Sequence, residues 1–262
     1  MLVESSSPDD AHLSPREPAT TERMVNQVPL ASYPIGSPAD LEEIRYGPNV
    51  PGEHELKLLG PLQGRRVLVL GCGAGVLPIV LTRMGAKAIV VDPDEANLAR
   101  TGELATEHGH RIELHHADLA ELAFVRGDSI HLTVSIFGLA GVDDLPRLFR
   151  QVHRVLTPDS PVVFSLPHPA FSMLVGDGGD GSRIARSYFD DEPTVWTFEN
   201  RSGRDRTHTT AQVFLALNRA GFVTDTLLEP EPSRPGDRDP QWSDSMRMVP
   251  STLVIRARKR GI

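Results

Sequence analysis

The chain has 262 residues, a hydrophobic fraction of 39% and 22 glycines, a composition typical of a globular domain rather than of a disordered or collagen-like chain. No apolar run approaches the roughly 20 residues that span a bilayer, and one cysteine excludes an intramolecular disulfide and a cysteine-based zinc site. The net charge of −8 argues against nucleic-acid binding. The first ten residues lack the features of a secretory signal, so we expect a cytoplasmic protein with no nucleic acid, membrane or metal among its partners.

Residues 1–38 are polar, contain prolines throughout and show no helical or alternating periodicity. Such a segment buries too little apolar surface to offset the entropy of ordering it. We expect it to be disordered, with a lid over a ligand site, formed by residues 24–38, as the alternative.

From residue 39 onward, short apolar runs alternate with amphipathic segments in the manner of an α/β protein. The runs predict seven strands, at residues 67–70, 88–91, 112–116, 130–135, 162–166, 222–228 and 252–257. The segments between them predict helices at residues 53–59, 76–84, 94–108, 143–156 and 210–220, the last ended by Gly221.

This order predicts a doubly wound, mostly parallel sheet of seven strands with helices on both faces. No helix separates the last two strands, so the final strand is expected to run antiparallel. The pattern breaks at residues 167–207, which hold glycines, charges and scattered aromatic residues. We interpret this segment as a substrate cap inserted into the domain formed by residues 39–262.

A glycine-rich turn follows the first predicted strand, where the segment from Val67 to Gly75 reads VLVLGCGAG. Glycines in a strand-to-helix turn let the backbone approach a ligand, and the helix begins with free N–H groups. Asp92 ends the second strand, 21 residues after Gly71, at the spacing from which an acid reaches the ribose of a bound nucleotide. An adenosine-type ligand is therefore indicated.

A dinucleotide fingerprint would need glycine where Val76 stands, which disfavours a nicotinamide-dependent oxidoreductase. The spacing instead resembles motif I of the class I S-adenosylmethionine-dependent methyltransferases, and the resemblance extends over residues 46–259. It includes Asp92, the Ala117-Asp118-Leu119 segment after the third strand and the Ala220-Gly221-Phe222 segment before the sixth. The branch it resembles includes ubiquinone and menaquinone enzymes and bacterial natural-product methyltransferases.

The resemblance implies a Rossmann-like fold, S-adenosyl-L-methionine as cofactor, and methyl transfer to an O, N or C nucleophile of a small molecule, as in bacterial secondary metabolism. A protein of this fold that binds the cofactor without methylating is the alternative. Asp92 would bind the ribose diol and Asp118 the adenine amino group. The other residues that the resemblance places along the cofactor are Gly71, Cys72, Gly73, Gly75, Pro93, Leu119 and Ser135.

Three positions depart from the family pattern. The acid usual in the first strand, which helps to hold the methionine ammonium, is Val69. The Asp usual at the start of the fourth strand is His131, and the Gly-Gly pair usual before the fifth is Asp159-Ser160. The loss of a carboxylate that pairs with an ammonium weakens binding by about 1–3 kcal/mol.

Several of these residues have a structural interpretation beside the functional one. Asp92 precedes Pro93 and Asp94 and could instead be a helix N-cap. His168, after the fifth strand, and His208, before the helix that follows the insertion, are the candidate catalytic bases, because histidine titrates near neutral pH. The alternative for each is a structural role in a turn or a first helical turn.

Overall fold

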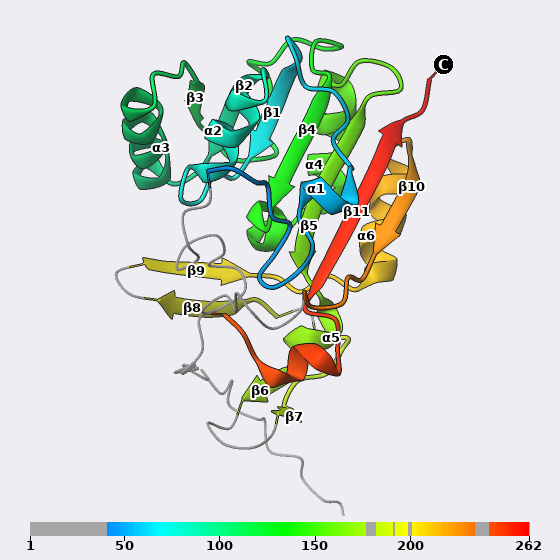
Figure 1. Cartoon of the computed structure of the whole chain (residues 1–262). Helices are drawn as coiled ribbons and strands as arrows, with labels where there is room; N and C mark the ends of the chain where they lie inside the picture. Colours follow the sequence, from blue (N-terminus) through cyan, green and yellow to red (C-terminus); the bar gives the residue numbers. More distant parts are fainter. Residues whose placement is uncertain (1–40, 177–181, 191, 199–200, 234–240, 262) are drawn as a thin grey trace, which may run out of the picture.

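The computed structural model describes residues 41–176, 182–190, 192–198, 201–233 and 241–261, so the expected disorder or lid of residues 1–38 lies outside the described residues. Within them, one seven-stranded sheet has the order β10-β11-β5-β4-β1-β2-β3 (Figure 1). Its strands are β1 (Arg66–Leu70), β2 (Lys87–Asp92), β3 (Glu113–His116), β4 (Leu132–Ile136), β5 (Pro161–Pro167), β10 (Phe222–Leu228) and β11 (Thr252–Lys259). No helix in this part of the chain is long and apolar enough to cross a membrane.

Strands β1 to β5 are parallel to one another, whereas β11 is antiparallel to both of its neighbours, β5 and β10. The predicted mostly parallel sheet with an antiparallel last strand is therefore confirmed. The described residues between β10 and β11 form no α-helix, and β11 inserts between β10 and β5.

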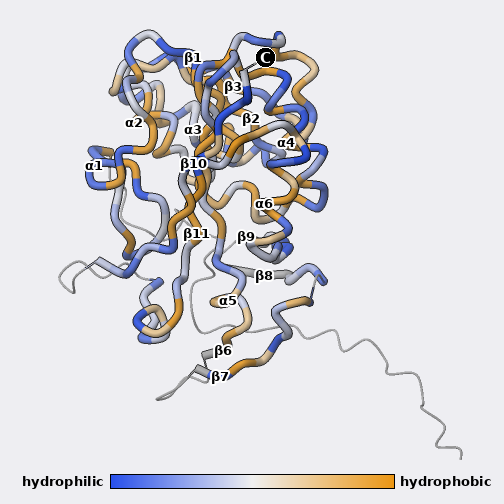
Figure 2. Tube along the Cα trace, turned by 90° about the vertical axis from the view of Figure 1, so that its right-hand side faces the viewer, coloured by the Kyte–Doolittle hydropathy of each residue, from blue (hydrophilic) through white to orange (hydrophobic). Residues whose placement is uncertain are grey.

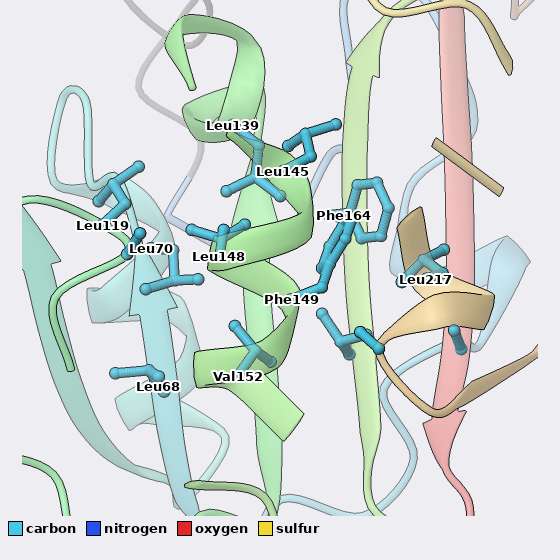
Figure 3. Packing of buried hydrophobic residues seen from close by; sticks show 14 of the residues in the cluster. Leu68, Leu70, Leu119, Leu139, Leu145, Leu148, Phe149, Val152, Phe164 and Leu217 are labelled. Carbon is cyan, nitrogen blue, oxygen red and sulfur yellow. The ribbon is translucent and has the colours of Figure 1, made fainter. Parts of the chain in front are cut away.

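Helices cover both faces of the sheet, which Figure 2 shows edge-on with α1 on one side and α4 and α6 on the other. The helices are α1 (Glu53–Leu56), α2 (Val76–Arg83), α3 (Glu95–Glu107), α4 (Leu145–Val155) and α6 (Thr210–Arg219). Alternate residues of β1 enter opposite cores: Leu68 and Leu70 pack with α4 and α6, whereas Val67 and Val69 pack with α1, α2 and α3. Figure 3 shows Leu148, Phe149 and Val152 of α4 directed at the sheet.

Most predicted elements lie within two residues of the observed bounds, but the first helix is shorter than the expected 53–59. It ends at Leu56 because Lys57 adopts a left-handed conformation with φ 50°. The Glu53 carboxylate then accepts the N–H groups of Leu58 and Leu59, at 2.9 and 3.0 Å, which turns the chain back instead of extending the helix.

The insertion after β5 contains regular structure that the sequence did not predict. It forms α5 (Pro169–Ser172), a hairpin of β6 (Leu174–Gly176) and β7 (Ser182–Ile184), and a hairpin of β8 (Thr194–Phe198) and β9 (Arg201–Asp205). The loop expected at residues 229–250 also folds, as the 3-10 helix η3 (Asp244–Arg247), and buries Met246. Figure 1 places all of these elements beyond the carboxyl ends of the parallel strands, so a second segment lies at this end of the sheet beside the insertion expected to be the cap.

The loop after β4 packs directly on the loop after β1. It forms the 3-10 helix η2 (Gly138–Gly141), whose first residue lies against Gly71. A Cβ atom added at Gly138 would overlap the Leu70 carbonyl oxygen and lie 2.8 Å from Ser135 Oγ. Glycine at residue 138 is therefore required for the contact between the two loops.

We predict that Gly138→Ala lowers the free energy of unfolding by about 1–3 kcal/mol, as expected for overpacking. The matched control is Gly102→Ala in α3, where the added Cβ would meet Leu114 at an ordinary 3.4 Å. Because alanine favours a helix over glycine, the control should be neutral or stabilising by up to about 1 kcal/mol. Urea unfolding of both variants checks this, and equal stability of the two would contradict the required contact.

Candidate functional site

The turn between β1 and α2 has the backbone shape that its glycines allow. Gly71, Gly73 and Gly75 have φ angles of 76°, 50° and 84°, in the left-handed region that side chains disfavour. A Cβ at Gly71 would lie 2.8 Å from Gly138 Cα, and one at Gly75 would lie 3.0 Å from Thr101 Cα. The turn is thus held between η2 and α3, and the N–H groups at the start of α2 remain available for a ligand.

Asp92 is the last residue of β2 and is only 3% exposed. One carboxylate oxygen accepts the backbone N–H of Cys72 at 2.7 Å, and the other accepts that of Asp94 at 2.8 Å. The side-chain amide of Asn97 donates to both oxygens, at 3.2 and 3.3 Å. The N-cap of α3 is Asp94, whose carboxylate accepts the Ala96 N–H, so the alternative of Asp92 as the cap is wrong.

Cys72 completes this cluster through its thiol, 3.3 Å from the same Asp92 oxygen that accepts its N–H. Burial, together with the negative charge of Asp92, raises the pKa of the thiol to about 12. The thiol is therefore protonated at neutral pH and donates to the carboxylate, which excludes it as a nucleophile there.

The residues expected at an adenine ring lie on the loops after β2 and β3. Pro93 and Asp118 are exposed, and the Pro93 carbonyl accepts a hydrogen bond from His116 Nε2 at 3.0 Å. One Asp118 oxygen accepts the Ala120 N–H at 2.8 Å, which fixes the turn. Leu119 is 5% exposed and packs in the core with α4, so its side chain supports this loop from below (Figure 3).

Ser135 was expected to border the methionine arm, but its side chain is turned into the sheet. Its hydroxyl is fully buried and donates to the Leu70 carbonyl at 2.6 Å. The hydrogen bond joins the carboxyl ends of β4 and β1 and leaves only the backbone around Ser135 to approach a ligand. Phe137, two residues after Ser135, has a φ of 54°, an uncommon conformation for a bulky residue, at the same edge of the sheet.

His168 is buried at the junction of three strands. Its backbone N–H donates to the Ser251 carbonyl before β11, and its Nε2 lies 2.9 Å from a carboxylate oxygen of Glu229 after β10. Its Nδ1 accepts the Ala170 N–H at 3.1 Å, as the N-cap of α5. Because both ring nitrogens are engaged, the described contacts favour a structural role for His168 over the predicted catalytic one.

His208 has a different arrangement. Its Nε2 is 2.9 Å from the Val142 carbonyl oxygen, and since a carbonyl only accepts, Nε2 carries the proton. Burial lowers the pKa of the ring, which therefore keeps its neutral form near pH 7 with a lone pair on Nδ1. Two further contacts attach this segment to η2 and its flank: the Arg206 N–H donates to the Ala140 carbonyl at 2.8 Å, and the Arg206 guanidinium pairs with Asp143 at 2.8 Å.

Known proteins that resemble this chain in sequence or structure include methyltransferases. A family model described as a methyltransferase domain matches residues 67–159. A ubiquinone biosynthesis O-methyltransferase of Azorhizobium caulinodans is 30% identical over 112 residues, which cover 43% of this chain but only 44% of that protein. A solved S-adenosylmethionine-dependent methyltransferase of Mesorhizobium loti is 27% identical with a TM-score of 0.60, over 78% of this chain and 94% of its own.

Residues 67–159 therefore match the methyltransferase-domain family, and the seven-stranded sheet has the fold of the class I S-adenosylmethionine-dependent methyltransferases. The strand order is the one expected of this family. The same fold also occurs in the solved structure titled [4+2]-cyclase SpnF, at 17% identity and a TM-score of 0.53 over 78% of this chain and 77% of that one. Likeness at that level shows the fold alone.

Two departures from the methyltransferase pattern keep the local geometry and lie away from the glycine turn. His131 precedes β4 at the opposite edge of the sheet, where its Nδ1 accepts the Arg66 N–H at 3.1 Å. Asp159 has a φ of 61°, the left-handed conformation that explains why glycine is usual there and that Asp tolerates. Both residues precede their strands, so neither lies at the carboxyl edge of the sheet, where the glycine turn is.

The remaining departure, Val69, lies within β1, the strand that leads into the glycine turn. Its side chain is 0% exposed and packs among apolar residues of the core that faces α2. A carboxylate at this position would have to displace that packing, and a buried unpaired charge is strongly unfavourable. The chain therefore has the acid that the family pattern places at a ribose, but lacks the acid that it places at a methionine ammonium.

The sequence did not reveal two side chains that shape the site. Asn97 lies one turn into α3 and contacts Asp92, yet an asparagine within a helix carries no distinguishing signal. Glu229 follows β10 and meets His168 across 61 residues, a pairing that depends on the strand order. Only the strand order brings Glu229 and His168 together.

The lowered pKa of His208 predicts that acid destabilises the fold. An unfolded histidine binds a proton below about pH 6.5, whereas the folded ring resists it, so stability should fall as pH falls from that value. His208→Gln keeps a donor for Val142 and removes the titration, and it should lessen the loss by up to about 1.4 kcal/mol per pH unit.

Urea unfolding at pH 7.5 and at pH 5.5 measures this difference. His153, whose pKa burial and Lys259 also lower, should maintain part of the acid sensitivity in the variant. Identical pH dependence of the two proteins would show that His208 takes up its proton equally well in the folded state.

Proposed function

We propose that this chain transfers the methyl group of S-adenosylmethionine to an O, N or C nucleophile of a small molecule. The observation that carries the proposal is the buried Asp92 carboxylate beside a glycine turn, at the carboxyl edge of the sheet. Ligands of open α/β sheets bind at this edge. The name of the Azorhizobium relative supports a small acceptor, and a role in bacterial secondary metabolism is part of the same proposal.

The residues of the site fit the nucleoside half of the cofactor. Asp92 would accept hydrogen bonds from the ribose diol, while Gly71, Gly73 and Gly75 would let the backbone approach the ligand closely. Pro93 and Asp118 would lie along the adenine. Cys72 would contribute its backbone, and the backbone at Ser135 would border the methionine arm.

The bound cofactor would supply a sulfonium methyl group that is already strongly electrophilic. The protein then has to position the acceptor in line with that group and to remove a proton where the acceptor carries one. His208 is the better candidate base because its Nδ1 holds a lone pair at neutral pH, on a segment attached to the loop after β4. Tyr188, which lies in the insertion, is proposed as a wall of the acceptor pocket.

Val69 favours a second candidate function. A protein of this fold that binds the cofactor without methylating fits the missing carboxylate, and the [4+2]-cyclase SpnF is a protein of the same fold with another named activity. Cofactor binding without methyl transfer to any acceptor in a broad panel would favour this second function.

We predict that calorimetry detects binding of S-adenosylhomocysteine and that Asp92→Ala weakens it by about 1–3 kcal/mol, through loss of charge-assisted bonds to the ribose. Asp94→Ala is the matched control, since it removes the neighbouring carboxylate, which caps α3. The control should lower the melting temperature but leave the affinity unchanged. Absence of binding by the wild-type protein at millimolar ligand would refute the cofactor assignment.

We also predict that substitutions of the two histidines, His208 and His168, have different effects. His208→Gln should lower methyl transfer about 10²- to 10⁴-fold, the usual contribution of a general base, with unchanged affinity for S-adenosylhomocysteine. His168→Gln breaks the contacts with Glu229 and Ala170 and should chiefly lower stability. Turnover is measured with radiolabelled cofactor against phenols, amines and carbon acids. Full activity of His208→Gln would remove it as the base.

A further inference from the structure

The Asp92 carboxylate already has as many hydrogen bonds as it can well accept. A carboxylate offers about four lone-pair positions. In this structure the donors are the backbone N–H groups of Cys72 and Asp94, the Cys72 thiol, and the Asn97 amide, which reaches both oxygens. A ribose diol would bring two more O–H donors, so at least one donor now present must leave.

The backbone donors are the ones least able to move. The turn that carries the Cys72 N–H is fixed by hydrogen bonds from the Gly71 N–H to the Val91 carbonyl and from the Gly75 N–H to the Cys72 carbonyl. Asp94 begins α3 and caps it. Their bonds to Asp92 are also the shortest, at 2.7 and 2.8 Å.

The side-chain donors are held more weakly. Both contacts of the Asn97 amide exceed 3.1 Å, at 3.2 and 3.3 Å, longer than the usual length for an N–H donor to oxygen. A thiol is a weak donor. The amide also spans both carboxylate oxygens, as the two hydroxyls of a diol would.

We propose that Asn97 occupies the place of the ribose diol and is displaced when a nucleoside binds. This inference rests on the proposed function and identifies a further residue that sets its affinity for the cofactor. Asn97 acts through Asp92, so it is a positioning residue. It keeps the buried carboxylate hydrogen-bonded in the absence of ligand, and each binding event must break that contact.

The test compares the affinities of the wild-type protein and one variant for two ligands. Asn97→Leu removes the amide donor, and the 2′-deoxy analogue of S-adenosylhomocysteine lacks one of the hydroxyls that would displace it. The variant should bind S-adenosylhomocysteine about tenfold more tightly, the size of one hydrogen bond, because no contact is broken on binding. Affinity for the deoxy analogue should change less than twofold, because in the wild-type protein the amide keeps one of its contacts with this ligand.

The unliganded variant should also have a lower melting temperature, since Asp92 loses a donor. Asn97→Ala serves in its place if the leucine variant does not fold. Thr106→Val is the control on the same helix, where the lost hydroxyl donated only to the Gly102 carbonyl, and it should leave both affinities unchanged.

Two outcomes would overturn the displacement of Asn97 by the ribose diol and leave the proposed function standing. One is an equal change in affinity for the two ligands on substitution of Asn97, and the other is weaker binding of S-adenosylhomocysteine by the variant. Failure of the wild-type protein to bind S-adenosylhomocysteine would overturn both.

Discussion

The buried carboxylate of Asp92 is the interaction on which the proposed site depends. It joins the end of β2 to the glycine turn through the Cys72 N–H and to α3 through Asn97 and Asp94. A negative charge taken out of water requires several donors, and these donors come from the segments that would surround a nucleoside. The need to satisfy this one group therefore fixes the relative position of β1, β2 and α3 at the ligand edge.

A second set of contacts extends from the glycine turn to the cap. Gly71 lies against Gly138 of η2, and η2 and its flank accept hydrogen bonds from Arg206 and His208 of the segment that leaves β9. A change at the glycine turn would consequently reach the cap through a single short 3-10 helix. This continuity offers a physical route by which cofactor and acceptor sites would sense each other, because packed segments transmit displacement rather than absorb it.

Local patterns were sufficient to predict the sheet but not the cap. The strands are short apolar runs bounded by turns, and the prediction that β11 runs antiparallel followed from the missing helix before it. The β6–β7 and β8–β9 hairpins lack alternation, and Met246 is buried within a segment that is polar and proline-rich in sequence. The contacts of His168 with Glu229 and Ser251 arise only when β5, β10 and β11 are adjacent, which no local signal contains.

The same distinction explains which departures from the methyltransferase pattern matter. The His131 side chain accepts a backbone N–H, and Asp159 adopts a left-handed turn, so the fold retains its geometry with different side chains. Val69 replaces a charged group by an apolar one inside a closed core, and no rearrangement of the same side chain restores the charge. Binding energy would then come mainly from the nucleoside half of the cofactor, where Asp92 lies. The donors around that carboxylate, Asn97 above all, would then set the affinity of this chain for the cofactor.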